Sequence, residues 1–150
     1  MNAPILRFLG AISIVGVTLP TPADANAPAG RYVVTNGGTV NGTVYDTKTK
    51  LTWQQTVPST TYAWADAKTY CTSMGSGWRL PTIKEVQTIV DVSQGVPSID
   101  PTAFPSTPAN YYWSSSSVAS SPSYAWAVDF HYGSTHGYVV FGLYNVRCVR

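Results

Sequence analysis

Residues 61–74 read T-Y-A-W-A-D-A-K-T-Y-C-T-S-M, and residues 146–150 read V-R-C-V-R. They contain Cys71 and Cys148, the only two cysteines of the 150-residue chain. A disulfide between them would tie a predicted helix to the last predicted strand and enclose nearly the whole second half of the chain in one loop. It would also leave no thiol for catalysis, because a reactive cysteine must be a thiolate. The alternative is two free buried thiols.

The first 25 residues have the layout of an export signal. Arg7 precedes an apolar, uncharged run at residues 8–19, and Ala23-Asp24-Ala25 offers a small-x-small cleavage pattern. The run is too short to cross a bilayer, which favours a cleaved signal peptide over residues 1–25 rather than a membrane span or a buried N-terminal helix. No cysteine lies near the cleavage site for a lipid anchor. We therefore expect a secreted or periplasmic protein, in a compartment where paired cysteines persist.

Length and charge limit the classes of partner. The mature chain of about 125 residues is enough for one ordinary domain, which follows an N-terminal lead-in at residues 26–41. The net charge is +2 and the charges are scattered, which argues against nucleic acid or a strongly anionic membrane as a partner. Only 11% of the residues are charged whereas 13% are aromatic, so Ser, Thr, Asn and Tyr must keep the surface polar.

Patterns of apolar and polar residues predict an α+β domain with two helices and antiparallel strands. Residues 43–45 and 51–54 flank a polar, turn-like stretch, which predicts a β-hairpin. The first helix follows, and Thr60 or Thr61 is positioned to cap it. Its buried stripe at helical spacing consists of Trp64, Ala67, Cys71 and Met74.

A second helix and three strands complete the predicted fold. Thr82 and Glu85 fit a capping box, in which each side chain bonds a backbone amide at the other position. The apolar face of this helix consists of Val86, Ile89 and Val90. The strand-like segments that follow are residues 111–115, 124–130 and 137–149. The last of these is too long for one strand and contains Gly142, so we expect a break or a hairpin within it.

Eight short motifs occur in order along the last two thirds of the chain. They are L-T-W-Q-Q at 51–55, A-W-A-D-A-K-T-Y-C at 63–71, W-R-L-P-T-I-K-E-V at 78–86, I-D at 99–100, F-P at 104–105, Y-W-S-S-S at 112–116, Y-A-W-A-V-D-F at 124–130 and V-R-C-V-R at 146–150. Together they resemble the C-terminal domain family of the Legionella collagen-like adhesin, over about residues 42–150. That family is similar to C-type-lectin-like folds and to formylglycine-generating-enzyme domains. The resemblance implies a C-type-lectin-like domain with a disulfide from the first helix to the last strand, between Cys71 and Cys148. No collagen-like Gly-x-y tract is present, so the full architecture of the adhesin is not implied.

The sequence offers no convincing catalytic or metal centre. Calcium needs several converging oxygens, whereas the carboxylates here are dispersed. His131 and His136 alone supply too few ligands for a metal site, so we interpret them as surface residues. The serine run at 114–117 has no nucleophile-elbow motif, and Asp91 and Asp100 are interpreted as structural rather than as a glycosidase acid pair. We therefore expect no catalytic residue, no metal and no cofactor. The rival hypotheses are a secreted hydrolase or protein-modifying enzyme of the formylglycine-generating type, and a structural subunit of an envelope assembly.

One segment, residues 131–145, differs in composition from the motifs on either side. It reads H-Y-G-S-T-H-G-Y-V-V-F-G-L-Y-N, is rich in aromatic residues and contains no Lys, Arg, Asp or Glu. Rigid rings with small polar neighbours are typical of recognition surfaces. The candidate ligand-binding residues are Tyr132, Ser134, His136, Tyr138, Phe141 and Tyr144. We expect a non-enzymatic module that binds a cell-surface or matrix glycan or protein, with retroelement diversification of this segment as a narrower hypothesis. The alternative is an ordinary hairpin with partly buried aromatics.

Overall fold

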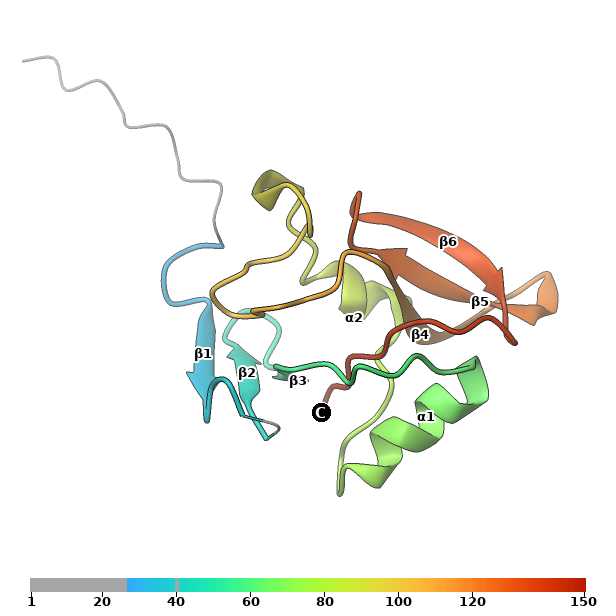
Figure 1. Cartoon of the computed structure of the whole chain (residues 1–150), viewed down its shortest axis with the longest axis horizontal. Coiled ribbons are helices and arrows are strands. Elements are labelled where there is room, and N and C mark those ends of the chain that lie inside the picture. Colours follow the sequence, from blue (N-terminus) through green and yellow to red (C-terminus); the bar gives the residue numbers. More distant parts are fainter. Residues whose placement is uncertain (1–26, 40) are drawn as a thin grey trace, which may run out of the picture.

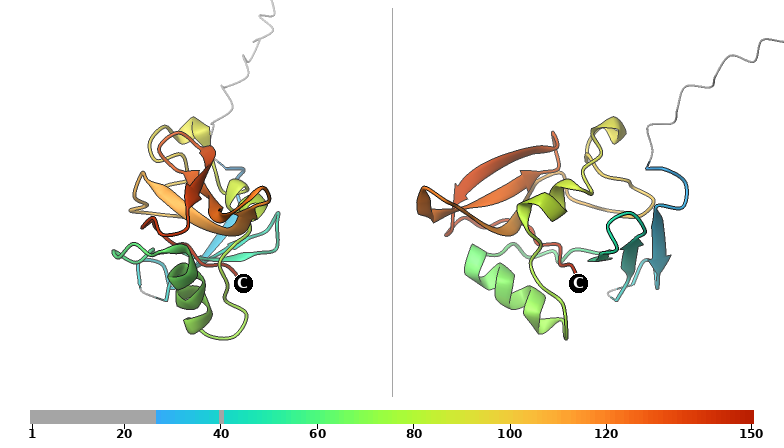
Figure 2. Two further views of the ribbon diagram at one scale, coloured as in Figure 1. Left: turned by 90° about the vertical axis from the view of Figure 1, so that its right-hand side faces the viewer. Right: turned by 180° about the vertical axis from the view of Figure 1, so that it is seen from behind.

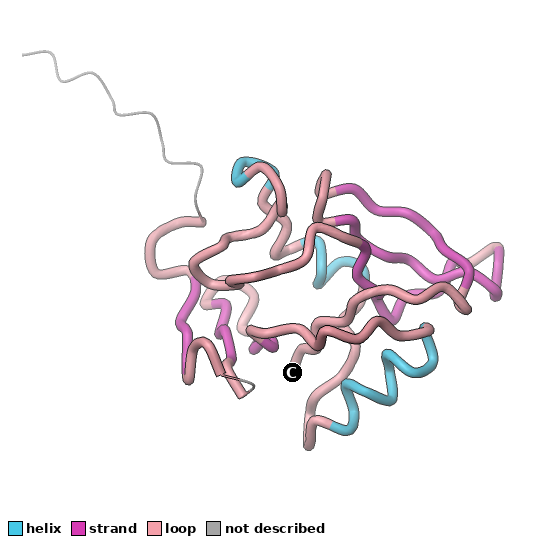
Figure 3. The backbone as a smooth tube through the Cα atoms, in the orientation of Figure 1, coloured by secondary structure: helices cyan, strands magenta, loops and turns pink. Residues whose placement is uncertain are grey.

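The computed structural model describes residues 27–39 and 41–150, so the predicted signal peptide over residues 1–25 lies outside it. The described residues confirm the α+β class, with two α-helices and two three-stranded antiparallel sheets. In chain order the elements are β1 (Tyr32–Thr35), β2 (Thr43–Asp46), β3 (Thr52–Gln54), α1 (Trp64–Ser73), α2 (Ile83–Gln87), a 3-10 helix (Val92–Gln94), β4 (Tyr111–Val118), β5 (Ser121–Asp129) and β6 (Ser134–Val139). The two sheets lie toward opposite ends of the molecule (Figure 1), and loops make up much of the chain between them (Figure 3).

The first sheet contains the predicted hairpin. β2 and β3 pair antiparallel with Val44 opposite Trp53, and the Asp46 carboxylate holds the turn by accepting a hydrogen bond from the Lys48 amide (2.9 Å). β1 adds a third strand beside β2, and Arg31, just before it, forms an ion pair with Asp46 (2.9 Å). Part of the predicted lead-in is therefore built into this sheet.

The helix α1 has the predicted buried stripe but not the predicted cap. Of the four residues of the stripe, Ala67 and Cys71 are fully buried, whereas Trp64 and Met74 are partly buried against the same core cluster. Neither of the two threonines expected to cap the helix does so, because the helix begins at Trp64 after Ala63. The Trp64 N–H donates instead to the carbonyl of Val140 (3.0 Å), so a backbone group far along the chain replaces the side-chain cap.

The helix α2 begins with the predicted capping box. Thr82 Oγ1 accepts a hydrogen bond from the Glu85 N–H (3.3 Å), and the Glu85 carboxylate accepts one from the Thr82 N–H (2.8 Å). The helix ends at Gln87, earlier than the apolar pattern suggested, because the N–H groups of Ile89 and Val90 bond to carbonyls three residues back rather than four. Ile89 is nevertheless buried in the core.

The second sheet, in the order β4-β5-β6, is packed on both faces. On one face, Trp113 and Ala127 pack in a core cluster with Ala67 and Cys71 of α1. On the other face, Val128 belongs to a second cluster that includes residues of α2 and the first sheet. Figure 2 shows the two helices on different sides of this sheet. Alternating strand residues thus serve two cores.

The predicted strand-like segment at residues 137–149 is divided, as we expected, but its bounds differ from the prediction. β6 begins earlier, at Ser134, and ends at Val139, and the expected break follows as a turn around Gly142. The chain then returns to the middle of the molecule (Figure 1) as an extended stretch, residues 145–149, which we call the C-terminal segment. Its residues form isolated bridges with several elements instead of a regular strand.

The C-terminal segment links the two sheets. Asn145 exchanges hydrogen bonds with β4, donating to Tyr111 O and accepting from Trp113 N–H (both 3.0 Å). Further along, the Cys148 carbonyl accepts from the β3 residue Gln54 (2.9 Å). Val146 and Cys148 pack in one core cluster, and Val149 packs in the other. Alternate side chains of this extended segment therefore enter two different cores.

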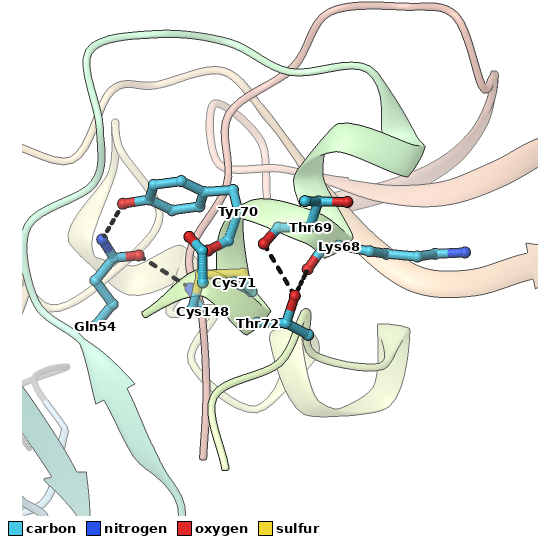
Figure 4. The surroundings of a disulfide bond; sticks show 8 residues. Gln54, Lys68, Thr69, Tyr70, Cys71, Thr72 and Cys148 are labelled. Carbon is cyan, nitrogen blue, oxygen red and sulfur yellow. Dashed lines mark hydrogen bonds between the residues drawn. A yellow bond between two sulfur atoms is a disulfide. The ribbon is translucent and has the colours of Figure 1, made fainter. Parts of the chain in front are cut away.

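The predicted disulfide between Cys71 and Cys148 is present. Cys148 lies in the C-terminal segment, after the last strand, β6. We expected the bridge to reach the last strand, but it reaches the segment that follows that strand. Figure 4 shows Gln54 beside the bridge, where its Oε1 accepts from the Cys148 N–H (3.2 Å) and its Nε2 donates to the Tyr70 hydroxyl (2.9 Å). The cross-link thus joins α1 to the segment that pairs with β3.

Candidate functional site

The predicted binding region divides at its end into two parts. Asn145 belongs to the buried C-terminal segment, whereas residues 131–144, which we call the hairpin segment, form the β5–β6 loop, β6 and the turn after it. The hairpin segment lies at the end of the molecule away from the first sheet (Figure 1). It carries no Lys, Arg, Asp or Glu.

The β5–β6 loop exposes two rings on a fixed backbone. His131 and Tyr132 contact each other with ring centroids 4.2 Å apart, and both are exposed. Gly133 has a φ of 73°, and a Cβ placed on it would lie 2.7 Å from a methyl of Val92 and 2.9 Å from a methyl of Val90. Only glycine fits this position, which seats the loop against the residues that follow α2.

On β6, Ser134 and His136 form a hydrogen bond between Oγ and Nε2 (3.0 Å). A serine beside a histidine is the beginning of a nucleophilic arrangement, but such an arrangement also needs a third group that orients the base. Within the described residues, neither of the two ion pairs involves a histidine, so no carboxylate there orients His136. The pair offers a hydroxyl and an imidazole for hydrogen bonding at the surface.

Tyr138 and Tyr144 belong to a packed cluster of rings. Tyr138 lies 4.7 Å from Tyr111 and 5.0 Å from Tyr144, measured between ring centroids, and Tyr144 lies 4.8 Å from Trp113. Burial, with the neighbouring Tyr111 hydroxyl, raises the pKa of Tyr138, and burial also raises the pKa of Tyr144. Both hydroxyls stay neutral at physiological pH, and the rings support the hairpin rather than projecting from it.

The turn after β6 presents apolar side chains to solvent. Phe141 is 83% exposed and Leu143 is 62% exposed, and next to them the cross-strand pair Tyr124 and Val139 is 40% and 44% exposed. We call these four residues the turn surface. Gly142 between the first two lies close to a neighbouring ring, since a Cβ there would be 3.0 Å from Tyr144. The turn is thereby fixed against the ring cluster.

The structure separates the six candidate residues into two sets. Tyr132, His136 and Phe141 are exposed, whereas Ser134, Tyr138 and Tyr144 are half-buried. Tyr132 lies in the loop before β6 and Phe141 in the turn after it, so the exposed candidates are spread along the hairpin rather than gathered in one pocket.

Sequence reasoning did not identify three exposed residues of the turn surface: Tyr124, Val139 and Leu143. Tyr124 and Val139 are opposite each other in the β5–β6 register, which could not be derived without knowing where β6 begins. Leu143 precedes Tyr144 in an apolar run without regular alternation, so the sequence pattern does not indicate that the Leu143 side chain is exposed.

Within residues 27–39 and 41–150, no three His, Cys, Asp or Glu side chains are grouped so that they could hold a metal ion. In the same residues, no helix combines the length and the apolar character that a membrane span requires.

The sequence model of the Lcl C-terminal domain family matches residues 42–150. This match confirms the resemblance drawn from the ordered motifs. No curated protein matches the chain.

Proposed function

The chain belongs to the Lcl C-terminal domain family, and we propose that it is an exported, non-enzymatic module that binds a glycan or protein of a cell surface or matrix through its hairpin segment. The observation that carries this proposal is the turn surface together with Tyr132. Five large apolar side chains are exposed along a stretch of the molecule that has very little charge.

Exposed apolar side chains indicate an interaction site when they lie next to one another. Single exposed hydrophobic residues are ordinary, but neighbouring ones mark interaction sites. Here Phe141 and Leu143 occupy one turn, and the Tyr124–Val139 pair adjoins it. Aromatic rings surrounded by small polar groups supply contact area with little loss of side-chain entropy on binding.

The residues packed beneath this surface hold its backbone in one conformation, which favours ligand binding. Gly133 seats the loop on Val90 and Val92, and Tyr138 and Tyr144 pack beneath the turn. A preformed backbone reduces the entropy lost when a ligand binds.

Export and the finer fold assignment are parts of the same proposal. The disulfide supports a secreted or periplasmic location, because such bonds persist in oxidising compartments. A C-type-lectin-like topology is supported by the family, by the two helices and by the cross-link from α1 to the end of the chain.

A glycan and whole-cell binding screen of the mature domain, followed by single alanine variants, tests the proposal. Phe141→Ala and Tyr132→Ala each remove an exposed ring, and we expect at least one of them to weaken binding about thirtyfold with the melting temperature unchanged. Tyr45→Ala is the matched control, since Tyr45 is an exposed tyrosine of the first sheet. If neither hairpin variant differs from this control, the hairpin segment is scaffold.

The hydrolase hypothesis has one observation in its favour, the bond between Ser134 and His136. A fluorophosphonate probe distinguishes the two functions, because it labels activated serines. We expect no labelling, as His136 has no orienting carboxylate among the described residues. Labelling that disappears in Ser134→Ala would overturn the non-enzymatic assignment.

A further inference from the structure

The strand β6 forms an open edge of the second sheet. Its register with β5 pairs Ser134 with Asp129 at one end and Val139 with Tyr124 at the other, and the Val140 N–H donates to the carbonyl of Ser123 (3.0 Å). Nothing in the described chain pairs with the other side of β6.

The direction of each backbone group follows from this register. Hydrogen-bonded and non-hydrogen-bonded pairs alternate in an antiparallel ladder. Because Val140 bonds to Ser123, the alternate residues Tyr138, His136 and Ser134 direct their backbone groups toward β5. Thr135 and Gly137 therefore direct their N–H and C=O groups away from the sheet.

Val139 lies in the same outward-facing row. Its carbonyl accepts from the Gly142 N–H (2.9 Å), which leaves its own N–H for a partner. The outer side of β6 thus offers three N–H groups and two carbonyls at the spacing of a β-strand.

The opposite edge of the same sheet is closed. β4 is covered by the C-terminal segment through Asn145 and by Pro81, whose carbonyl accepts from the Ser115 N–H (2.7 Å). In the first sheet, β3 is covered in the same way, since the Thr52 N–H donates to the Arg150 carbonyl (2.8 Å). Covering of this kind is how proteins usually protect a sheet edge.

The edge strand β1 is protected by other means. It has four residues, begins beside the Arg31–Asp46 ion pair and is followed directly by Asn36, whose φ is 52°. Short strands, charge and a local bend all discourage pairing at an edge. β6 has six residues, contains no charged Lys, Arg, Asp or Glu and no proline, and has Gly137 near its centre. It lacks each of these protections.

We propose that β6 is a strand-addition site, at which an extended, uncharged segment of a partner protein pairs antiparallel or parallel as a fourth strand of this sheet. This inference rests on the proposed function and narrows its ligand to a polypeptide. The main-chain groups of Thr135, Gly137 and Val139 would supply affinity, as in other domains that bind peptides along a sheet edge. The exposed side chains of Tyr132 and Phe141, at the two ends of β6, would contact the ends of the added strand.

The chemistry of the hairpin favours a polypeptide over a sugar. No carboxylate, amide or guanidinium side chain occurs from His131 to Tyr144, so the polar side chains that could bind several hydroxyls at once are few. The backbone of β6 is the densest set of unused donors and acceptors there. The absence of charge matches an uncharged segment, because an ionised side chain would lose solvent on this surface without finding a partner.

Proline substitution tests the site without removing β5 pairing, since proline is tolerated where a strand N–H faces solvent. Random linear peptides displayed on phage are selected for binding to the mature protein. The affinity of the selected peptides is then measured for Thr135→Pro and for its matched control, Thr135→Val. We expect the proline variant to weaken peptide binding at least about tenfold, while the valine variant, which keeps the N–H, binds as the wild type does. Equal binding to both variants would overturn the proposal.

Amide hydrogen exchange of the wild-type protein gives a second readout that needs no variant to fold. Without peptide, the amides of Thr135, Gly137 and Val139 should exchange fast, and those of Ser134 and His136 slowly. A selected peptide should protect the first set. Protection that grows with protein concentration alone would identify a second copy of the chain as the occupant and overturn the peptide assignment. Binding in the glycan screen with no peptide selected would overturn strand addition but leave the binding module standing.

Discussion

The hairpin segment and the C-terminal segment are consecutive in the chain, and both are rich in apolar residues, yet they have opposite surroundings. All five residues of the C-terminal segment are buried, and its backbone bonds to β3, β4 and Arg79. The hairpin segment exposes Tyr132, Phe141 and Leu143, and the outward N–H groups of β6 have no backbone partner in the described chain. The boundary between them falls between Tyr144 and Asn145.

The difference separates what holds the fold together from what is available for recognition. In the C-terminal segment, alternate side chains enter two different cores, and a side-chain change there disturbs both sheets. In the hairpin segment, exposed rings add nothing to the cores. We therefore expect variants of the first segment to reduce stability, and variants of the exposed part of the second to reduce binding only.

Removing the disulfide should have the largest effect on the C-terminal segment. Cys71 and Cys148 are 77 residues apart in the sequence. Closing a loop of this length stabilises a fold by about 4 kcal/mol if chain entropy dominates. We expect Cys71→Ala/Cys148→Ala to lose about this much unfolding free energy in urea denaturation.

Non-reduced mass spectrometry of the wild type should show no alkylatable thiol, which is the necessary control. A double variant as stable as the wild type would mean that the C-terminal segment is held by its backbone bonds and cores alone.

Replacing Arg147 tests the same segment from its other face. Its guanidinium is buried and donates to the carbonyls of Gln54 (2.8 Å) and Gln55 (2.6 Å) and to the Thr107 hydroxyl (2.8 Å). Burial lowers the pKa of Arg147 to about 10, so the group is still a cation at neutral pH. We expect Arg147→Lys to keep the charge, lose the forked geometry and cost about 3 kcal/mol in urea denaturation.

Arg150→Lys is the matched control, because Arg150 follows the segment and is exposed. An Arg147→Lys variant within experimental error of this control would show that a point charge satisfies the site, and that the fork contributes little.

Much of the scaffold could be predicted because its signals are local. The capping box of Thr82 and Glu85 lies within four residues, the β2–β3 hairpin surrounds a short polar turn, and Cys71 had only one possible partner. The predicted cap of α1 failed for the opposite reason, since the N–H of Trp64 bonds to Val140, a residue distant in sequence.

The candidate site could be predicted only as a region. The segment's composition indicated recognition, but exposure depends on where β6 begins and on which rings contact Tyr111 and Trp113. Leu143 and Tyr144 are adjacent and both apolar, yet one is exposed and the other packs in the ring cluster. No local pattern distinguishes them.

These two neighbours provide the next test. Tyr144→Ala should cost about 2 kcal/mol of stability, because the ring contacts Trp113, Tyr111 and Tyr138. Leu143→Ser should change stability by no more than about 0.5 kcal/mol, as expected for an exposed position. Thermal and urea unfolding of the two variants measures both effects. Equal losses would move the boundary between scaffold and recognition surface to an earlier residue.

The smallest expected effect concerns the outer support of the C-terminal segment. Arg79 exchanges backbone hydrogen bonds with Val149 (2.9 and 3.0 Å), and its guanidinium bonds to both carboxylate oxygens of Glu85 (2.7 Å each). The Arg79 guanidinium, together with the N–H and hydroxyl of Thr82, lowers the pKa of Glu85 to about 2. Because this pKa is below the ordinary value of about 4.3, ionised Glu85 stabilises the fold at neutral pH.

That contribution should be complete above the unfolded-state pKa and disappear as the pH falls toward about 2. The Arg79 side chain is 45% exposed, so solvent screening limits the gain to about 1 kcal/mol or less. We expect Glu85→Gln to be less stable than the wild type at neutral pH, and urea denaturation curves recorded at decreasing pH should bring the two proteins together. Asp66→Asn, at an exposed carboxylate of α1 without an ion pair in the described chain, is the control and should show no comparable convergence. A difference between Glu85→Gln and wild type that persisted at the lowest pH would mean that the amide loses a packing or capping contact rather than a charge, and that the segment's outer support does not depend on this ion pair.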